Sequence, residues 1–408
     1  MGRSLSLLIL GSLLILLAVR SYVYFSGNKL SDGSKIEFEG RVTSQIKTNS
    51  FSQSFSLNYK GKRIFLNLPL RPTINYGDKL KTSGVIVLKK LDRGEIWVLE
   101  EPEIVFEKEK FSLLSPVYSF RSKVISVFKS YLPSDEASLL LGIVFGIKES
   151  FSEDFYEDLR TAGVLHVIAA SGMNVSMLGA LLAGFFGAFL KRQIAVLLTI
   201  FGIFVFTAIA GFEASIVRAA IMGTLAFSAQ ILGKQSWAFF GLLISGFLML
   251  FVSPALLFDI GFQLSFSATL GLIYISPLID KMFRFKKIPL VRFISEDANT
   301  TISAQIATLP IILSNFGNFS LFSVFANVLV LWTVPILMII GGIVSIFAFF
   351  FEGFGIVLYL ALPLLLYFKS VVELFGKFGG QLALSEFPWQ LSIGYYLLIL
   401  SIFARKIK

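Results

Sequence analysis

The chain has 408 residues, of which 55% are hydrophobic and 15% are charged, and its formal net charge is +10. A soluble domain carries roughly a quarter charged residues, so this composition excludes an ordinary soluble protein. Apolar runs of ~20 residues recur along the chain, which is the length of a helix that crosses about 30 Å of hydrocarbon. These runs do not alternate between apolar and polar residues as the strands of a membrane barrel do. The sequence therefore predicts a polytopic α-helical membrane protein.

Cysteine is absent from the sequence, and His166 is its only histidine. Disulfides are therefore excluded, and neither a structural zinc site nor a histidine-rich catalytic metal site is expected. We predict no metal, no other cofactor and no enzymatic activity. The positive charge suits cytosolic loops and anionic lipid, but it equally suits a polyanionic partner such as nucleic acid. Charge alone does not choose between these partners.

An apolar run over residues 4–19 lies between Arg3 and Arg20. No small-x-small cleavage site follows this run, as one would after a signal peptide. Residues 1–24 are therefore predicted to be an uncleaved first transmembrane helix, with its N-terminus in the cytosol.

Residues 30–110 differ from the rest of the chain because short segments in them alternate between apolar and polar residues. The alternating segments, separated by turn residues, are 35–42, 52–59, 63–70, 79–88 and 96–106. A period of two predicts a small all-β domain of five strands, similar to an OB-fold, which we expect outside the cytoplasm. Basic residues outnumber acidic ones here, and OB-folds often bind single-stranded nucleic acid. A structural or protein-binding barrel is an equally good interpretation.

Residues 118–408 are predicted to form a helical membrane core. Segment 118–132 has the pattern of a basic amphipathic helix on the membrane surface, and Ser134 is the expected N-cap of the next helix. The apolar run 137–147 that follows is too short to span, so we expect it to be re-entrant or interfacial. Membrane spans are predicted at 164–190, 194–212, 216–232, 237–252, 255–277, 301–313, 322–350, 355–367 and 391–403. The basic segments 281–292 and 405–408 are expected to face the cytosol.

Polar residues within the predicted spans are the candidate functional residues, because they are costly there unless they face protein or water. One group surrounds the only histidine, and a second pairs an arginine with a glutamate five residues earlier. Two more groups recur at helical spacing on one face, and Asn327 belongs to a fifth. Each group alone is explained by hydrogen bonding between helices, but all of them together favour a water-containing path. The candidates are His166, Ser171, Gly172, Asn174, Glu213, Arg218, Asp259, Gln263, Gln305 and Asn327.

A serine hydrolase is the enzymatic alternative, since Ser171 precedes a glycine and would need His166 as its base. On one continuous helix, five residues place these side chains about 140° apart around the axis. They could not then form a hydrogen bond unless the backbone were broken between them. The geometry therefore disfavours an intramembrane hydrolase.

Four sequence blocks carry a resemblance to a known family, and Asn327 follows them. The blocks are Leu159–Val175, Ile216–Met222, Asp259–Phe266 and Ala304–Pro310. In this order they resemble the ComEC-type competence proteins, in which a histidine and a Ser-Gly pair open the core. An Arg-Ala block and a Gly-Phe-Gln-Leu-Ser-Phe block follow in that family. The first helix and the OB-like domain also fit its layout.

The resemblance implies a channel in the cytoplasmic membrane that imports single-stranded DNA during natural transformation. It also implies a cytosolic motor, and it leaves a surface DNA receptor, a separate nuclease and a second copy of the chain as further partners besides the lipid bilayer. The chain departs from the family at Asn174, where a second histidine is common. It also ends at Lys408, before the metallo-β-lactamase-like domain of larger members, so we expect nuclease activity to come from another polypeptide or to be absent. The alternative function is a transporter or flippase for another anionic or amphipathic substrate.

Overall fold

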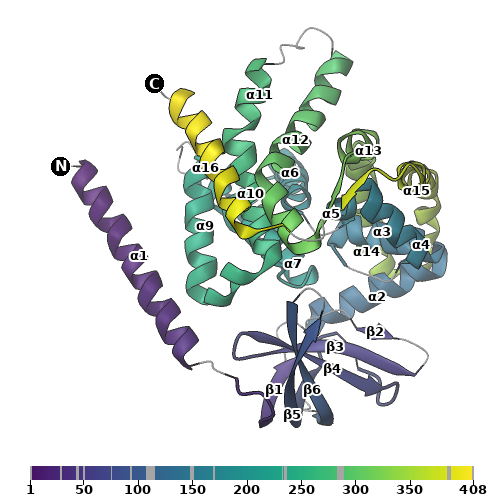
Figure 1. Cartoon of the computed structure of the whole chain (residues 1–408). Coiled ribbons are helices and arrows are strands. Elements are labelled where there is room, and N and C mark those ends of the chain that lie inside the picture. Colours follow the sequence, from purple (N-terminus) through teal and green to yellow (C-terminus); the bar gives the residue numbers. More distant parts are fainter. Residues whose placement is uncertain are drawn as a thin grey trace. The chain divides into compact units, whose positions relative to one another are not determined.

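The structure is a computed structural model, and its described residues form two compact units. The first comprises residues 1–123 and 243–259, and the second comprises residues 124–242 and 260–408. Figure 1 labels most of the elements of both units. The described residues are 2–27, 30–42, 46–48, 51–74, 76–91, 94–106, 115–147, 151–168, 171–231, 233, 237–282, 289–383 and 387–406.

The first unit begins with one helix and a curved sheet, and it also includes the helical residues 115–123 and the segment 243–259. The first helix and the strands are α1 (Gly2–Gly27), β1 (Lys35–Arg41), β2 (Lys47–Thr48), β3 (Ser52–Tyr59), β4 (Lys62–Pro69), β5 (Lys79–Leu91) and β6 (Gly94–Phe106). The strand order is β1-β5-β6-β4-β3-β2, and β4 and β6 pair in parallel while the other neighbours are antiparallel. A Cβ on Gly40 of β1 would lie 3.3 Å from the Cβ of Leu57 on β3, so the two ends of the sheet approach each other. This is the arrangement of a partly open Greek-key barrel of the OB type.

The alternation that predicted the strands reappears as alternating burial. On β4, Ile64, Leu66 and Leu68 point into the barrel core, while the residues between them are exposed or half-buried. Leu80 and Ile86 of β5 join the same apolar cluster. The predicted small all-β domain is confirmed, and each predicted strand coincides with an observed one to within a few residues.

The remaining elements are mostly helices. They are α2 (Ser115–Tyr131), α3 (Ser134–Phe145), α4 (Glu153–Ala162), α5 (Leu165–Ile168), α6 (Gly172–Phe189), α7 (Arg192–Ile209), α8 (Ala214–Ile231), α9 (Ala238–Val252), the 3-10 helix η1 (Pro254–Phe258), α10 (Ile260–Tyr274), α11 (Ser276–Met282), α12 (Pro289–Phe316), β7 (Asn318–Ser320), α13 (Ser323–Val330), α14 (Thr333–Phe350), the 3-10 helix η2 (Glu352–Leu360), α15 (Leu362–Lys377), β8 (Gln381–Ala383) and α16 (Trp389–Lys406). In the second unit α10 and α12 run side by side (Figure 1).

Among the described residues, five helical segments are long and apolar enough to cross a membrane: α6, α7, α8, residues 260–281 and α14. The pair η2 and α15, bent by 52°, would make a sixth if it acts as one broken span. The predicted polytopic helical membrane protein is therefore confirmed.

Several of the predicted spans are interrupted. The predicted span 164–190 is wrong only in its first residues. Helix α5 ends at Ile168, Ser171 has an extended conformation (φ −106°, ψ 162°), and the candidate span is α6, Gly172–Phe189. Spans 255–277, 322–350 and 355–367 are likewise divided into shorter helices. Hydropathy reports only whether side chains are apolar, and broken helices are tolerated at membrane depth where protein buries the freed backbone groups.

Helix α3 is an internal helix. It has 12 residues, which corresponds to ~18 Å, and every residue from Glu136 to Phe145 is buried. Gly341 of α14 packs against it so closely that a Cβ there would lie 2.6 Å from Val144 Cγ2. Burial on all sides is not that of an interfacial helix, so that alternative is wrong. The N-cap is Pro133, and the predicted N-cap, Ser134, is the first residue of the helix.

Some predicted features lie outside the described residues. They are part of the basic segment 281–292, the last two residues of the basic segment 405–408, and the two alanines at 169 and 170 that precede Ser171.

Candidate functional site

The break between α5 and α6 holds the motif that surrounds the only histidine. His166 donates from Nδ1 to the carbonyl of Gly163 at 3.1 Å, while Ser171 donates from Oγ to Oδ1 of Asn174 at 3.0 Å. Because of this break, His166 and Ser171 do not lie on one continuous helix, and helical geometry does not hold their side chains apart. However, each side chain is bonded to a different partner, so the described contacts do not form a serine–histidine pair.

Asn174 connects the start of α6 to the end of α3. Its side chain is 0% exposed, and its Nδ2 donates to the carbonyl of Ile143 at 2.8 Å. Its Oδ1 accepts the hydrogen bond from Ser171. Both the donor and the acceptor function of the amide are therefore used within the protein. Asn174 thus stabilises the position of the α6 N-terminus.

Arg218 of α8 lies where three helices meet. Its Nη1 donates to the carbonyl of Ser265 and to Oγ1 of Thr269, both on α10. Its Nη2 lies over Gly172 at the start of α6, where a Cβ would be only 2.7 Å away. Gly172 therefore has a steric function here, because it leaves room for the guanidinium between α6 and α8. The side chain of Arg218 is 8% exposed.

The partners that the structure describes for this guanidinium are neutral. Within the described ranges, Arg218 makes no ion pair, and its Nε has no hydrogen-bond partner. Glu213, the carboxylate nearest in sequence, lies just before α8, and its backbone carbonyl accepts the amides of Ile216 and Val217. A carbonyl and a hydroxyl are thus the groups that solvate the buried cation, and they leave its positive charge in place.

A second polar cluster joins α12 to α13. Gln305 donates from Nε2 to Oγ of Ser323 at 2.5 Å, and Ser323 donates to the carbonyl of Ser320 at 2.9 Å. Gly163 adjoins this cluster: its φ is +72°, and a Cβ on it would lie 2.6 Å from Cβ of Ser323. Because Gly163 also accepts the bond from His166, the histidine motif and the Gln305 motif belong to one region.

Asn327 follows Ser323 by one helical turn, on the same face of α13. Its side chain is 0% exposed. Neither Nδ2 nor Oδ1 has a hydrogen-bond partner among the residues that the structure describes. A buried amide whose donor and acceptor both lack a partner is uncommon in native proteins, and it indicates a role other than helix packing.

Asp259 and Gln263 do not form the continuous helical stripe that was predicted. Asp259 has extended backbone angles (φ −78°, ψ 122°), and α10 begins only at Ile260. The Asp259 carboxylate pairs with Arg63 at 3.4 Å, and Arg63 is largely exposed, so the pair contributes little. The prediction is therefore wrong at Asp259. Gln263 lies in the first turn of α10 and is half-buried.

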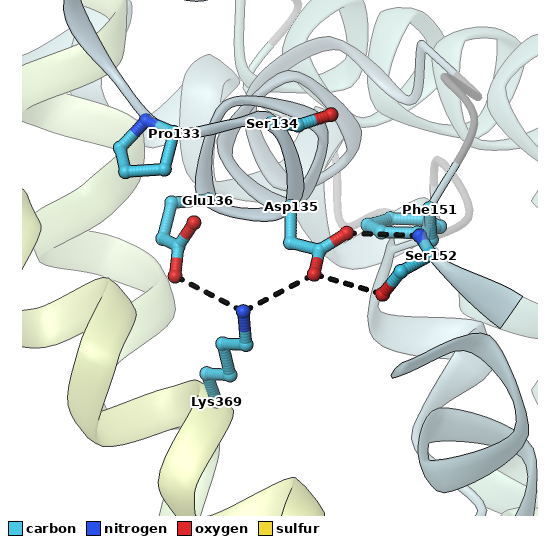
Figure 2. A pocket seen from close by; sticks show the side chains of 7 residues that line it. All are labelled: Pro133, Ser134, Asp135, Glu136, Phe151, Ser152 and Lys369. Carbon is cyan, nitrogen blue, oxygen red and sulfur yellow. Dashed lines mark hydrogen bonds and ion pairs between the residues drawn. The ribbon is translucent and has the colours of Figure 1, made fainter. Parts of the chain in front are cut away.

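A charged cluster that was not predicted from the sequence lines a pocket in the second unit (Figure 2). Lys369 of α15 donates from Nζ to Oδ2 of Asp135 at 3.1 Å and to Oε1 of Glu136 at 3.3 Å. Asp135 also accepts the amide of Ser152 and its hydroxyl, each at 2.9 Å. Burial by itself raises the pKa of Asp135, but the bonds from Ser152 and Lys369 outweigh it and lower that pKa.

A signal for this cluster was present in the sequence. Lys369 lies only two residues beyond the predicted span 355–367, within a helix whose preceding residues are apolar. A lysine in such a helix needs a carboxylate partner, and Asp135 and Glu136 begin another apolar helix. Nothing in the sequence pattern, however, indicated that α15 packs beside α3.

Together, the candidate spans and the barrel define a multi-pass helical membrane protein with a small β domain. Among the described residues, no group of three histidine, cysteine, aspartate or glutamate side chains could hold a metal ion. Residues 143–408 match the family described as "Competence protein". The chain belongs to the Competence protein family, which confirms the resemblance.

A curated relative supports the same assignment. The chain is 28% identical over 217 residues to ComE operon protein 3 of Bacillus subtilis (strain 168). The match covers 52% of this chain and 26% of that protein, so the matched segment spans about a quarter of the relative's length.

Proposed function

We propose that this chain acts in DNA uptake during natural transformation, as a channel that passes a single strand through the cytoplasmic membrane. Membership of the Competence protein family supports a role in competence. The observation that carries the channel proposal is Arg218, a buried cation whose described partners are neutral. A nucleic acid strand carries a negative charge at every phosphate, and its affinity for proteins comes largely from cations that neutralise these phosphates.

The orientation in the membrane follows from charge. With the N-terminus of α1 in the cytosol, a single crossing places the β domain outside, where incoming DNA arrives. An OB-type barrel provides a surface of the kind that binds single strands. A surface receptor, a separate nuclease and a cytosolic motor would act with this chain, and two copies of it could assemble together.

The proposal is tested by following labelled duplex DNA in cells that lack this chain. We expect DNA to bind the cell surface normally but never to become protected from added nuclease, and we expect the wild-type chain to restore protection. Normal internalisation without the chain would contradict a role in DNA uptake. A transporter or flippase for another anionic or amphipathic substrate would then be the better interpretation.

The break at Ser171 gives the hydrolase alternative a structural basis that also needs a test. We expect Ser171→Ala to retain most DNA internalisation, because the bond described for the hydroxyl is the one to Asn174 and its loss costs about 1–3 kcal/mol. The measurement is nuclease-protected DNA per cell at matched protein abundance. Complete loss of uptake in Ser171→Ala, with the protein still present in the membrane, would favour a catalytic serine.

A further inference from the structure

Helix α12 contains a proline within its interior. The helix has 28 residues, and Pro310 follows its first 21. Proline has no N–H, so the carbonyl four residues earlier, that of Ile306, loses its helical hydrogen bond. Where water is excluded, such a carbonyl must find another donor.

Two tyrosines of the last helix provide donors at this break. Tyr395 of α16 donates its hydroxyl to the carbonyl of Ile306 at 2.8 Å, and Tyr396 donates to the carbonyl of Ala307 at 3.0 Å. The bond that Pro310 removes from α12 is thus replaced by a bond from a different helix.

The part of α12 just before Pro310 is the part that contacts the candidate site. It carries Gln305, which holds Ser323 of α13. It also packs tightly on α10, where a Cβ on Gly271 would lie 2.8 Å from Cβ of Ala307. The part after Pro310 leads directly to β7, which pairs with β8. The proline therefore separates a segment held by the candidate site from a segment held by the small sheet.

We propose that Pro310 is the hinge of a gate and that Tyr395 and Tyr396 are its latch. Release of the latch lets the segment with Gln305 move away from Ser323 and admits water to Asn327. This motion would supply the partners that the Asn327 amide lacks in the present conformation. A role of this gate in the passage of a DNA strand rests on the proposed function. The motion itself can be measured without DNA.

The absence of cysteine from the chain makes this motion directly measurable. In Asn327→Cys the only thiol reports whether water reaches this position. The rate of its modification by a charged methanethiosulfonate is measured on the full chain in membrane vesicles. In the otherwise unchanged chain we expect slow modification. Adding Tyr395→Phe should raise the rate about tenfold, the factor that one lost hydrogen bond makes in an equilibrium.

The matched control is Tyr367→Phe, which removes a tyrosine hydroxyl that bonds the carbonyl of Leu329 on α13. That carbonyl does not lie at a proline, and we expect no change in the modification rate.

A second variant distinguishes a latch formed by the Tyr395 hydroxyl from a general effect of packing. Pro310→Ala restores the backbone donor for Ile306, so Tyr395→Phe should no longer raise the rate in that background.

Two results would overturn the gate. One is an unchanged modification rate in Tyr395→Phe, and the other is an increase that Pro310→Ala does not suppress. Transformation assays on the same variants test the proposed function separately. A latch-dependent thiol rate in a chain whose deletion leaves DNA uptake normal would support the gate and reject the DNA channel.

Discussion

Arg218→Ala is expected to lower DNA internalisation about a hundredfold. This factor corresponds to a free energy of about 3 kcal/mol, which is the contribution of two hydrogen bonds made by a charged group. The fold should survive the change. Thr269 already donates to the carbonyl of Ser265 at 2.9 Å, so both partners stay bonded to each other when the guanidinium is gone. The substitution also removes a buried charge and its desolvation cost. The measurement is nuclease-protected DNA per cell, normalised to the protein in the membrane.

Two further variants separate the charge of Arg218 from its geometry. Arg218→Lys retains the cation but not the planar fork, and we expect partial activity. Gly172→Ala retains the guanidinium but places a Cβ 2.7 Å from Nη2, so the group must shift. We expect activity between those of Arg218→Ala and the wild type. If Arg218→Ala internalises DNA normally at normal abundance, the arginine is a packing residue and the channel proposal loses its main support.

The sequence predicted the β domain well because a strand's pattern is local. Alternation over eight residues is enough to predict that Ile64 and Leu66 point inward and that Phe65 points outward. The pairing of β4 with β6 is not local, and nothing in the alternation indicated that it is parallel.

The sequence indicated which residues are candidates for the site, but it did not indicate which residues they contact. Arg218, Gly172 and Asn174 stood out because they are polar or small within apolar segments. Their partners lie far along the chain, as Thr269 does from Arg218 and Ile143 does from Asn174. The backbone break at Ser171 escaped prediction because side-chain hydropathy contains no information about backbone angles.

Lys369→Met should destabilise the protein by about 2 kcal/mol at neutral pH. Removing one partner of a buried ion pair costs about 3–5 kcal/mol. That figure is reduced here because the side chains of Lys369 and Asp135 are 24% and 15% exposed and solvent screens part of the charge. The variant leaves Asp135 and Glu136 as adjacent carboxylates without their cation. Thermal unfolding of the detergent-solubilised chain measures the change.

The stability difference between Lys369→Met and the wild type depends on pH. The folded state lowers the pKa of Asp135, so its stabilising contribution is present above the unfolded pKa and is lost as the pH falls through the lower, folded pKa. In Lys369→Met the carboxylates can relieve their repulsion by binding a proton. The difference in stability from the wild type should therefore shrink as the pH is lowered toward about 4. An equal difference at neutral and acidic pH would show that Lys369 acts through packing alone.

The triple variant Asp135→Asn, Glu136→Gln and Lys369→Met distinguishes an ion pair from a structural requirement for charge. Neutral groups of similar shape remove both the attraction and the cost of burying the charges, and such exchanges are often close to neutral. The asparagine oxygen can still accept the amide of Ser152, and the asparagine NH₂ can donate to the Ser152 hydroxyl, so the two bonds at this position can be kept. We therefore expect the triple variant to be more stable than Lys369→Met alone. If it is less stable, the charges themselves hold α3, α4 and α15 together, and the pocket in Figure 2 is an ionic joint of the helical unit.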